Sequence, residues 1–230
     1  MALNKEVFRT RALTALVFVL VMVAGIFINF YTFVALFLII MGGCLYEFRK
    51  IVKLIKPTKY FGLLALSMPY IIIPILMMID MAKKNPSYDL SLENYSPLLP
   101  IFIILSIWIN DTMAYLVGSF IGKTPFSKIS PKKTWEGTGG GAILCVVVMG
   151  LIAHFVTAFH SMPLHHWLII AAICAVFGTL GDLLESKIKR TANIKDSGSF
   201  MPGHGGFLDR FDSLLVATPF VWLYLQLFVR

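Results

Sequence analysis

The segment KIKRTANIKDSGSFMPGHGGFLDRFDS, residues 187–213, separates two long apolar runs near the end of a 230-residue chain. It holds five basic residues, three aspartates, one histidine and four glycines, although charged residues make up only 14% of the chain and hydrophobic residues 58%. Soluble domains carry roughly 25% charged residues, because a folded chain must cover a large surface with polar groups. The composition therefore indicates a polytopic membrane protein in which this segment is an unusually polar connection.

Seven apolar runs approach the roughly 20 residues that a helix needs to cross a bilayer. They predict an all-α bundle of about seven spans in one membrane domain, with residues 1–97 forming the N-terminal spans and 98–230 carrying the functional residues. The first run follows a basic lead and continues almost directly into the second, which favours an uncleaved span over a signal peptide. Pro69 and Pro74 predict a kink or a break in the third run. The predicted spans are 12–29, 31–47, 60–79, 98–120, 139–159, 165–184 and 211–229.

The basic residues predict an orientation for this bundle. All but three of the 20 lysines and arginines fall on one side of the predicted topology, the exceptions being Lys83, Lys84 and Arg230. Because positive residues stay in the cytoplasm, we expect a multi-pass protein of the cell membrane with a cytoplasmic N-terminus and a polar active-site cavity that opens to the cytoplasm. The basic stretch 47–60 is either part of this orientation signal or an amphipathic helix at the interface. The three cysteines, which lie in apolar runs without metal-ligand spacing, are expected to be small buried hydrophobes.

Asp111 lies near the middle of the fourth apolar run, beside Asn110 and Thr112. A charged residue at that depth is costly and usually functional. It is either a structural aspartate that is hydrogen-bonded between helices or, as we favour, part of the wall of a polar cavity.

Two acidic pairs flank the polar segment: Asp182 with Glu185, and Asp209 with Asp212. Their spacing of three residues places each pair on neighbouring positions of a helix. The helix dipole alone would favour the second pair at a helix start. Carboxylate oxygens are also the ligands that suit magnesium rather than zinc. The acidic pattern therefore indicates either a preference for a helix start or a magnesium site.

The connections between the spans have the chemistry of a phosphate site. In the polar segment, lysines and arginines supply cations, while Gly205 and Gly206 permit close backbone approach before a helix start. His204 is either a structural histidine or a donor and acid at a phosphate. The connection at 122–136 is also basic and rich in glycine without the spacing of a Walker loop, and it is either a solvated connection or a second part of the pocket. Its candidates are Ser130, Lys132, Lys133 and Glu136.

Residues 186–212 resemble the signature of phosphatidate cytidylyltransferases, the CDP-diacylglycerol synthases. The upstream stretches NDTMAYLVGSFIGKTPFSKISPKKTWEG and LGDLLES are also similar to this family, so that the resemblance is strong over residues 100–230. Met201 departs mildly from the family pattern, which usually has another apolar residue there. The matching residues are Ser186, Lys189, Arg190, Lys195, Asp196, Pro202, His204, Gly205, Gly206, Asp209, Arg210 and Asp212.

The resemblance implies that CTP and phosphatidate react to give CDP-diacylglycerol and pyrophosphate in a homodimer. It also implies Mg²⁺, sometimes with K⁺ as well, and a metal centre at Asp182, Asp209 and Asp212. It implies partners among nucleotides and membrane lipids and no nucleic acid. The alternatives are another CTP-dependent lipid enzyme, such as a CDP-ether-lipid synthase or a polyprenol kinase, and a cation transporter with ion sites at Asp111 and Asp182. The implied catalytic residues are Asp182, Lys195, His204, Asp209 and Asp212, and the implied substrate contacts are Asp111, Ser130, Lys132, Lys133, Glu136, Ser186, Lys189, Arg190, Asp196, Gly205, Gly206 and Arg210.

We predict that Asp209→Asn and Asp212→Asn each lower turnover by about tenfold or more, because each removes a carboxylate expected at the metal centre. Both variants should stay folded in membranes, which gel filtration in detergent checks. Turnover near the unsubstituted level in either variant would remove that residue from the metal centre.

Overall fold

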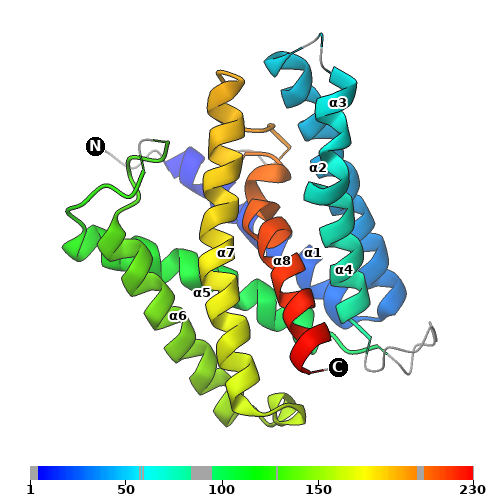
Figure 1. Ribbon diagram of the computed structural model, residues 1–230, viewed down its shortest axis with the longest axis vertical. Coiled ribbons are helices and arrows are strands. Elements are labelled where there is room, and N and C mark those ends of the chain that lie inside the picture. The colour runs from blue at the N-terminus through cyan, green and yellow to red at the C-terminus, as the bar shows by residue number, and fades with distance from the viewer. Residues whose placement is uncertain are drawn as a thin grey trace.

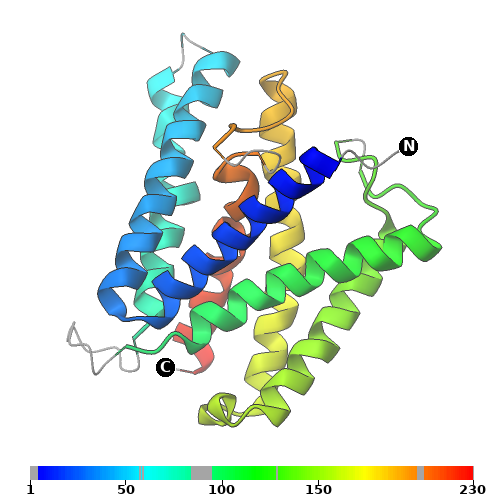
Figure 2. The same cartoon turned by 180° about the vertical axis from the view of Figure 1, so that it is seen from behind.

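The computed structural model describes residues 5–56, 58, 60–83, 95–127, 129–200 and 205–229, with side chains from residue 12 onward. All regular elements in this part of the chain are helices, and they pack as one bundle (Figures 1 and 2). They are α1 (Lys5–Phe27), α2 (Phe30–Ile55), α3 (Tyr60–Ala65), a π-helix (Met68–Ile72), α4 (Ile73–Met81), α5 (Leu98–Ile121), α6 (Trp135–Phe155), a 3₁₀ helix (Thr157–Ser161), α7 (Leu164–Thr191) and α8 (Leu208–Phe228).

Six helical segments are long and apolar enough to cross a membrane, and α1 adds a shorter apolar stretch, Ala12–Phe27. This confirms the expected all-α bundle of about seven spans in a multi-pass membrane protein. The helices extend beyond the apolar runs, because polar residues continue them: α2 reaches Ile55, so that the basic stretch after residue 47 is largely its last turns. The start of α6 lies four residues before the apolar run, since the Thr134 side chain caps it by accepting the Gly137 N–H at 3.1 Å.

The third span is interrupted where the two prolines lie, as expected. Helix α3 ends at Ala65, and a π-helical turn that contains Pro69 joins it to α4, which contains Pro74. Proline lacks a backbone N–H, so the regular hydrogen-bond ladder cannot continue through it, and a π turn is one way to absorb the mismatch. The three cysteines are buried and free, which confirms their assignment as core residues.

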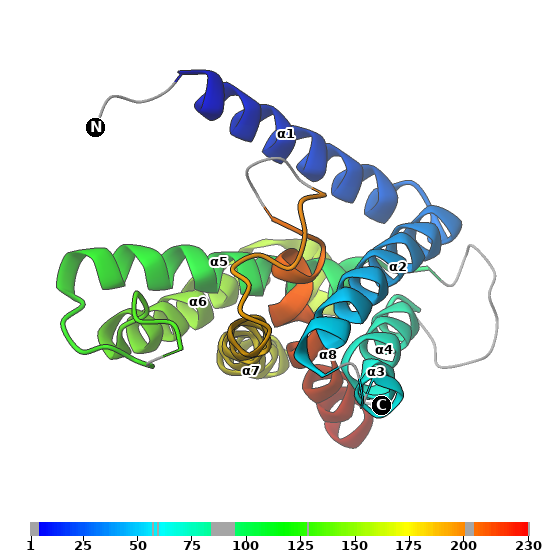
Figure 3. The ribbon, with the colours of Figure 1, turned by 90° about the horizontal axis from the view of Figure 1, so that it is seen from above.

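Helices α7 and α8 form the centre of the bundle. The α5–α6 hairpin lies on one side of them and α2 to α4 lie on the other, while α1 crosses the far face obliquely (Figures 1 to 3). Helices α7 and α8 come close at Gly181, where a β carbon would lie 2.6 Å from the backbone oxygen of Asp212. This contact brings Asp182 of α7 toward Asp212 of α8.

The polar connections gather at one end of the bundle. The start of α1, the junction of α5 with α6 and the junction of α7 with α8 all lie toward the upper end in Figure 1, whereas α4 and α8 finish at the lower end. This arrangement places the two connections with the expected site residues together, because two spans, α6 and α7, lie between them.

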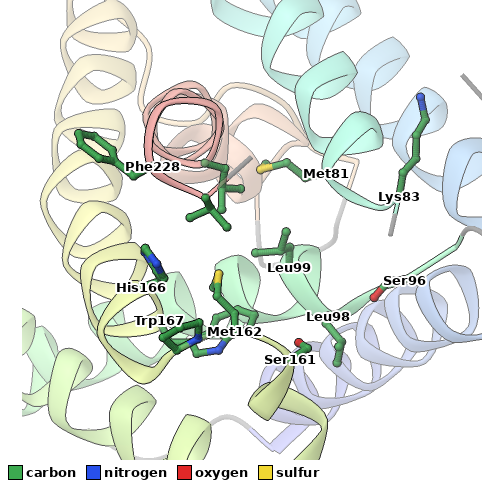
Figure 4. A pocket seen from close by; sticks show the side chains of 13 residues that line it. Met81, Lys83, Ser96, Leu98, Leu99, Ser161, Met162, His166, Trp167 and Phe228 are labelled. Carbon is green, nitrogen blue, oxygen red and sulfur yellow. The ribbon is translucent and has the colours of Figure 1, made fainter. Parts of the chain in front are cut away.

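A cavity of about 690 Å³ lies at the opposite end of the bundle (Figure 4). Its wall comes from the ends of α4, α5, α7 and α8 and includes Lys83, His166 and Trp167. None of the expected site residues that the structure describes lines this cavity.

We predict that Gly141→Val destabilises the bundle, because a β carbon at Gly141 would lie 2.6 Å from the backbone nitrogen of Ala114 on α5. Overpacking of this kind costs about 1–3 kcal/mol. Gly139→Val is the matched control, since a β carbon there meets no atom within 4 Å. The thermal unfolding midpoint in detergent should fall for the first variant and change little for the second, and equal midpoints would contradict this packing.

The orientation is tested by single cysteines at two exposed serines, Ser199 in the α7–α8 connection and Ser161 at the opposite end. The native cysteines are buried and should not react. An impermeant thiol reagent should label Ser199→Cys only from the cytoplasmic side and Ser161→Cys only from the other. The reverse pattern would overturn the orientation.

Candidate functional site

A cavity of about 490 Å³ lies between α5, the connection that follows it, and α7. It brings together five residues that the sequence placed in one pocket: Asp111, Ser130, Lys132, Lys133 and Asp182. We call it the α5–α7 cavity. The rest of its wall is largely small or polar: Asn110, Ala114, Tyr115, Gly118, Ser119, Thr134, Thr138 and Thr179.

Charges of both signs face this cavity. The Lys133 ammonium is paired with the carboxylate of Asp182, and the two side chains remain 26% and 31% exposed. The Ser186 hydroxyl donates to Asp182 Oδ1 at 3.3 Å and so fixes that carboxylate from the next turn of α7. A partly exposed ion pair can exchange partners at low cost, so that Lys133 can turn to a phosphate and Asp182 to a cation.

A polar contact between α5 and α7 forms part of the cavity wall. Asn110 Nδ2 donates to Thr179 Oγ1 at 3.4 Å, and that hydroxyl donates to the Ala175 carbonyl at 2.8 Å. Asp111 is the next residue after Asn110 and is exposed on the cavity wall. It is therefore accessible within an apolar span, as a functional aspartate would be.

Glu136 has a different position from the rest of the expected pocket. Its carboxylate accepts the backbone N–H groups of Lys123 and Thr124 at 3.1–3.2 Å and the Thr124 hydroxyl at 2.8 Å. It does not line the α5–α7 cavity. Glu136 therefore ties the start of the α5–α6 connection to the start of α6. Its predicted substrate contact stays a prediction.

A second group of polar residues surrounds Asp209 at the start of α8. Asp209 Oδ2 accepts the Ser197 N–H and hydroxyl, each at 2.9 Å, and the Gly206 N–H at 2.8 Å. Asp209 Oδ1 lies 2.5 Å from the Lys189 ammonium, which also lies 2.5 Å from Glu185 Oε2. We call these five residues the Asp209 cluster. A buried charge is tolerated when it is paired and hydrogen-bonded in this way.

Gly205 is required by the backbone of this cluster. Its φ of +84° lies in the left-handed region, and a β carbon would lie 2.6 Å from Asp209 Oδ2. A residue with a side chain would therefore be strained here and would press on the aspartate.

Asp212 lies between the two groups. It is 8% exposed, and its Oδ1 accepts the Ser213 N–H at 2.6 Å. Gly181 of α7 packs against the Asp212 backbone, so that Asp182, the next residue of α7, comes close to Asp212.

The magnesium prediction fits this contact of α7 with α8 only in part. Among the described residues, no group of three His, Cys, Asp or Glu side chains is arranged to hold a metal ion. Asp209 already accepts three hydrogen bonds and an ion pair, whereas Asp182 and Asp212 retain free acceptor capacity. Magnesium commonly uses one or two carboxylates together with substrate phosphates. The pair Asp182 and Asp212 fits such a site.

The remaining expected residues that the structure describes lie outside both groups. Arg190 is exposed and donates to the Ile194 carbonyl at 3.4 Å, and Lys195 and Asp196 are exposed on the same connection. Arg210 is exposed beside a crevice with Trp108. His204 lies outside the described residues. The structure thus gathers part of the predicted set and leaves the roles of the others as predictions.

Two residues at the site were missed in the sequence. Ser197 is 6% exposed, and its hydroxyl lies between the carboxylates of Asp209 and Glu47. Glu47 is 4% exposed in α2. The sequence does show Glu47 as an acidic residue at the end of an apolar run. Because basic residues follow it directly, the pattern favoured a solvent-exposed position.

Comparison with known proteins finds one matching family. The profile of the cytidylyltransferase family matches residues 90–228. A phosphatidate cytidylyltransferase of Bacillus subtilis is 41% identical over 139 residues, which are 60% of this chain and 51% of that protein. Enzymes with the same name from Staphylococcus epidermidis and Haemophilus influenzae are 43% and 38% identical over 52% and 57% of this chain and 45% and 46% of their own lengths. The matching part thus spans about half the length of these relatives.

We predict that Asp111→Asn lowers cytidylyltransferase turnover by about tenfold or more, because the cavity loses a charge while the shape and most hydrogen bonding are kept. Thr112→Val is the control, since its hydroxyl bonds only to the Trp108 carbonyl of its own helix and does not line the cavity. Undiminished turnover in the asparagine variant, measured with protein of unchanged unfolding midpoint, would make Asp111 a structural residue.

Proposed function

Since this chain belongs to the cytidylyltransferase family, we propose that it transfers the CMP group of CTP to phosphatidate. The products are CDP-diacylglycerol and pyrophosphate. The observation that carries this proposal is the α5–α7 cavity, in which Lys132 and Lys133 face Asp111 and Asp182 inside an apolar bundle. A phosphate-rich substrate and a cation supply the charges that such a cavity lacks.

The reaction needs one bond to form and one to break. A phosphate oxygen of phosphatidate attacks the α-phosphorus of CTP, and the bond from that phosphorus to the bridging oxygen of the β-phosphate breaks, so that pyrophosphate leaves with the electron pair. The attacking oxygen is already an anion, so the protein has no strong base to supply. Its task is to position two anions and to offset their charge.

The residues of the cavity divide this task. Lys132 and Lys133 line the cavity and would hold the triphosphate. Lys133 would leave Asp182 when a phosphate replaces that carboxylate as its partner. Asp182 and Asp212 would hold Mg²⁺ together with phosphate oxygens, and the ion would supply charge neutralisation at the transferring phosphorus. Asp209 orders the connection through Ser197 and Lys189, and a direct role at the metal would require Lys189 to leave it.

The substrates reach the site from different phases. CTP is soluble, and the proposed orientation places the α5–α6 and α7–α8 connections in the cytoplasm, where CTP is found. Phosphatidate keeps its chains in the bilayer while its phosphate stays at headgroup level. We therefore propose that the cavity opens to the cytoplasm and, at its side, to the inner leaflet.

Label position in CTP tests the reaction directly. The purified chain is incubated in lipid nanodiscs with phosphatidate and CTP labelled at either the α- or the γ-phosphate. We expect the α label to enter the lipid and the γ label to leave as pyrophosphate. Chelation of Mg²⁺ should abolish transfer, and Lys133→Ala should reduce it strongly, whereas Lys53→Ala, on exposed α2 surface, should not.

The same assay separates the alternatives. Transfer of the γ label to an isoprenoid alcohol would indicate a CTP-dependent lipid kinase, and transfer of the α label to an ether lipid in preference to phosphatidate would indicate the CDP-ether-lipid synthase. Absence of label from every lipid would overturn the proposal, and cation uptake by vesicles that contain the chain would then support a transporter.

The homodimer and the accompanying K⁺ are proposed from the resemblance alone. Sedimentation of the purified chain in detergent tests the first, and titration of K⁺ at fixed Mg²⁺ in the label assay tests the second.

A further inference from the structure

We infer that Glu47 of α2 is a positioning residue for the nucleotide site, through which the N-terminal helices hold the connection that carries the family signature. This inference rests on the proposed function. The family profile begins at residue 90, far after Glu47, so the family match assigns it no role.

Three hydrogen bonds join Glu47 to the signature segment. Its Oε1 accepts the Phe207 N–H at 3.0 Å, and its Oε2 accepts the Leu208 N–H at 2.9 Å and the Ser197 hydroxyl at 2.7 Å. These bonds span 150 to 161 residues of sequence. Both backbone donors lie at the start of α8, where an acidic group is favoured by the helix dipole.

Two signature glycines are shaped around the same carboxylate. A β carbon on Gly198 or on Gly206 would collide with Glu47 Oε1. On α2, a β carbon on Gly43 would collide with the ring of Phe207. Helix α2 and the signature segment therefore approach more closely than side chains would allow, and the carboxylate fills the space between them.

Glu47 reaches the site through a chain of direct contacts. The Ser197 hydroxyl lies between Glu47 Oε2 and Asp209 Oδ2, at 2.7 and 2.9 Å, and can donate its single proton to only one of them at a time. Asp209 in turn holds Lys189, which pairs with Glu185 on α7. Glu47 does not line the α5–α7 cavity, so it acts on substrate only through these residues.

Loss of the carboxylate leaves buried donors without partners. The N–H groups of Phe207 and Leu208 would lose their acceptor, and an unpaired buried donor is costly enough to shift the backbone. A shift there moves Asp209 and Asp212, which follow within the first turns of α8. A displacement of about 1 Å at a reacting geometry can cost up to about a hundredfold in rate.

The test combines a conservative series with a local structural readout. Glu47→Gln keeps the shape but replaces one acceptor by an amide donor, and Ser197→Ala removes only the link to Asp209. Arg49→Gln is the control, because this exposed side chain on the same helix also loses a charge. Backbone hydrogen exchange over residues 197–208 is measured together with kcat and KM for CTP and for phosphatidate.

We expect Glu47→Gln to speed exchange at Phe207 and Leu208 and to lower kcat/KM for CTP about tenfold or more. The KM for phosphatidate should change little, and Arg49→Gln should match the unsubstituted chain. Glu47→Asp, tested as the conservative rescue, should recover part of the loss. Because Glu47 and Ser197 act in one chain, the effects of Glu47→Gln and Ser197→Ala should be less than additive in the double variant.

The two readouts keep this inference separate from the proposed function. Unchanged exchange in Glu47→Gln overturns the positioning role whatever the activity, and faster exchange with unchanged kinetics for CTP overturns its connection to the site. If Glu47→Gln does not fold, Ser197→Ala decides by the same two measurements. If the unsubstituted chain makes no CDP-diacylglycerol, the proposed function fails, and hydrogen exchange alone then decides whether Glu47 positions the segment.

Discussion

A polar segment with several carboxylates can be held at the end of an apolar bundle only if every buried charge and backbone donor has a partner. Lys189 meets this requirement for two acids at once, since its ammonium lies 2.5 Å from both Glu185 and Asp209. Glu47 meets it for the start of α8 by accepting two backbone N–H groups. The site exists because these few contacts fix α8 and its preceding connection against α7 and α2.

Helix α7 is the element that both halves of the site share. Asp182, Glu185 and Lys189 follow each other at intervals of three and four residues and therefore lie along one face of this helix. The N-terminal end of that face borders the α5–α7 cavity through Asp182, and its C-terminal end enters the Asp209 cluster through Lys189. Any change in the packing of α7 on α8 therefore moves a residue of the cavity wall and the signature segment together.

The sequence predicted those features that depend on local composition. Apolar runs located the spans, Pro69 and Pro74 located the break, and the depth of Asp111 pointed to the cavity that it lines. The sequence could not show contacts between distant segments. Glu47 meets the signature segment about 160 residues later, and no periodicity or motif reports such a contact. Glu136 has the residue type of a substrate contact, and only the structure shows that its oxygens face Lys123 and Thr124.

The glycines of the signature show that a pattern typical of phosphate sites can also surround carboxylates of the protein. A glycine-rich stretch before a helix is the pattern of a phosphate site, because free backbone N–H groups bind anions. Here the Gly206 N–H is bound by Asp209, and the next two N–H groups are bound by Glu47. Carboxylates of the protein thus occupy the anion position at the start of α8. Under the proposed function a substrate phosphate would then depend on side-chain cations, and Lys132 and Lys133 of the α5–α6 connection face the cavity. In this structure the glycines permit the close approach of Glu47 on α2 and of Asp209.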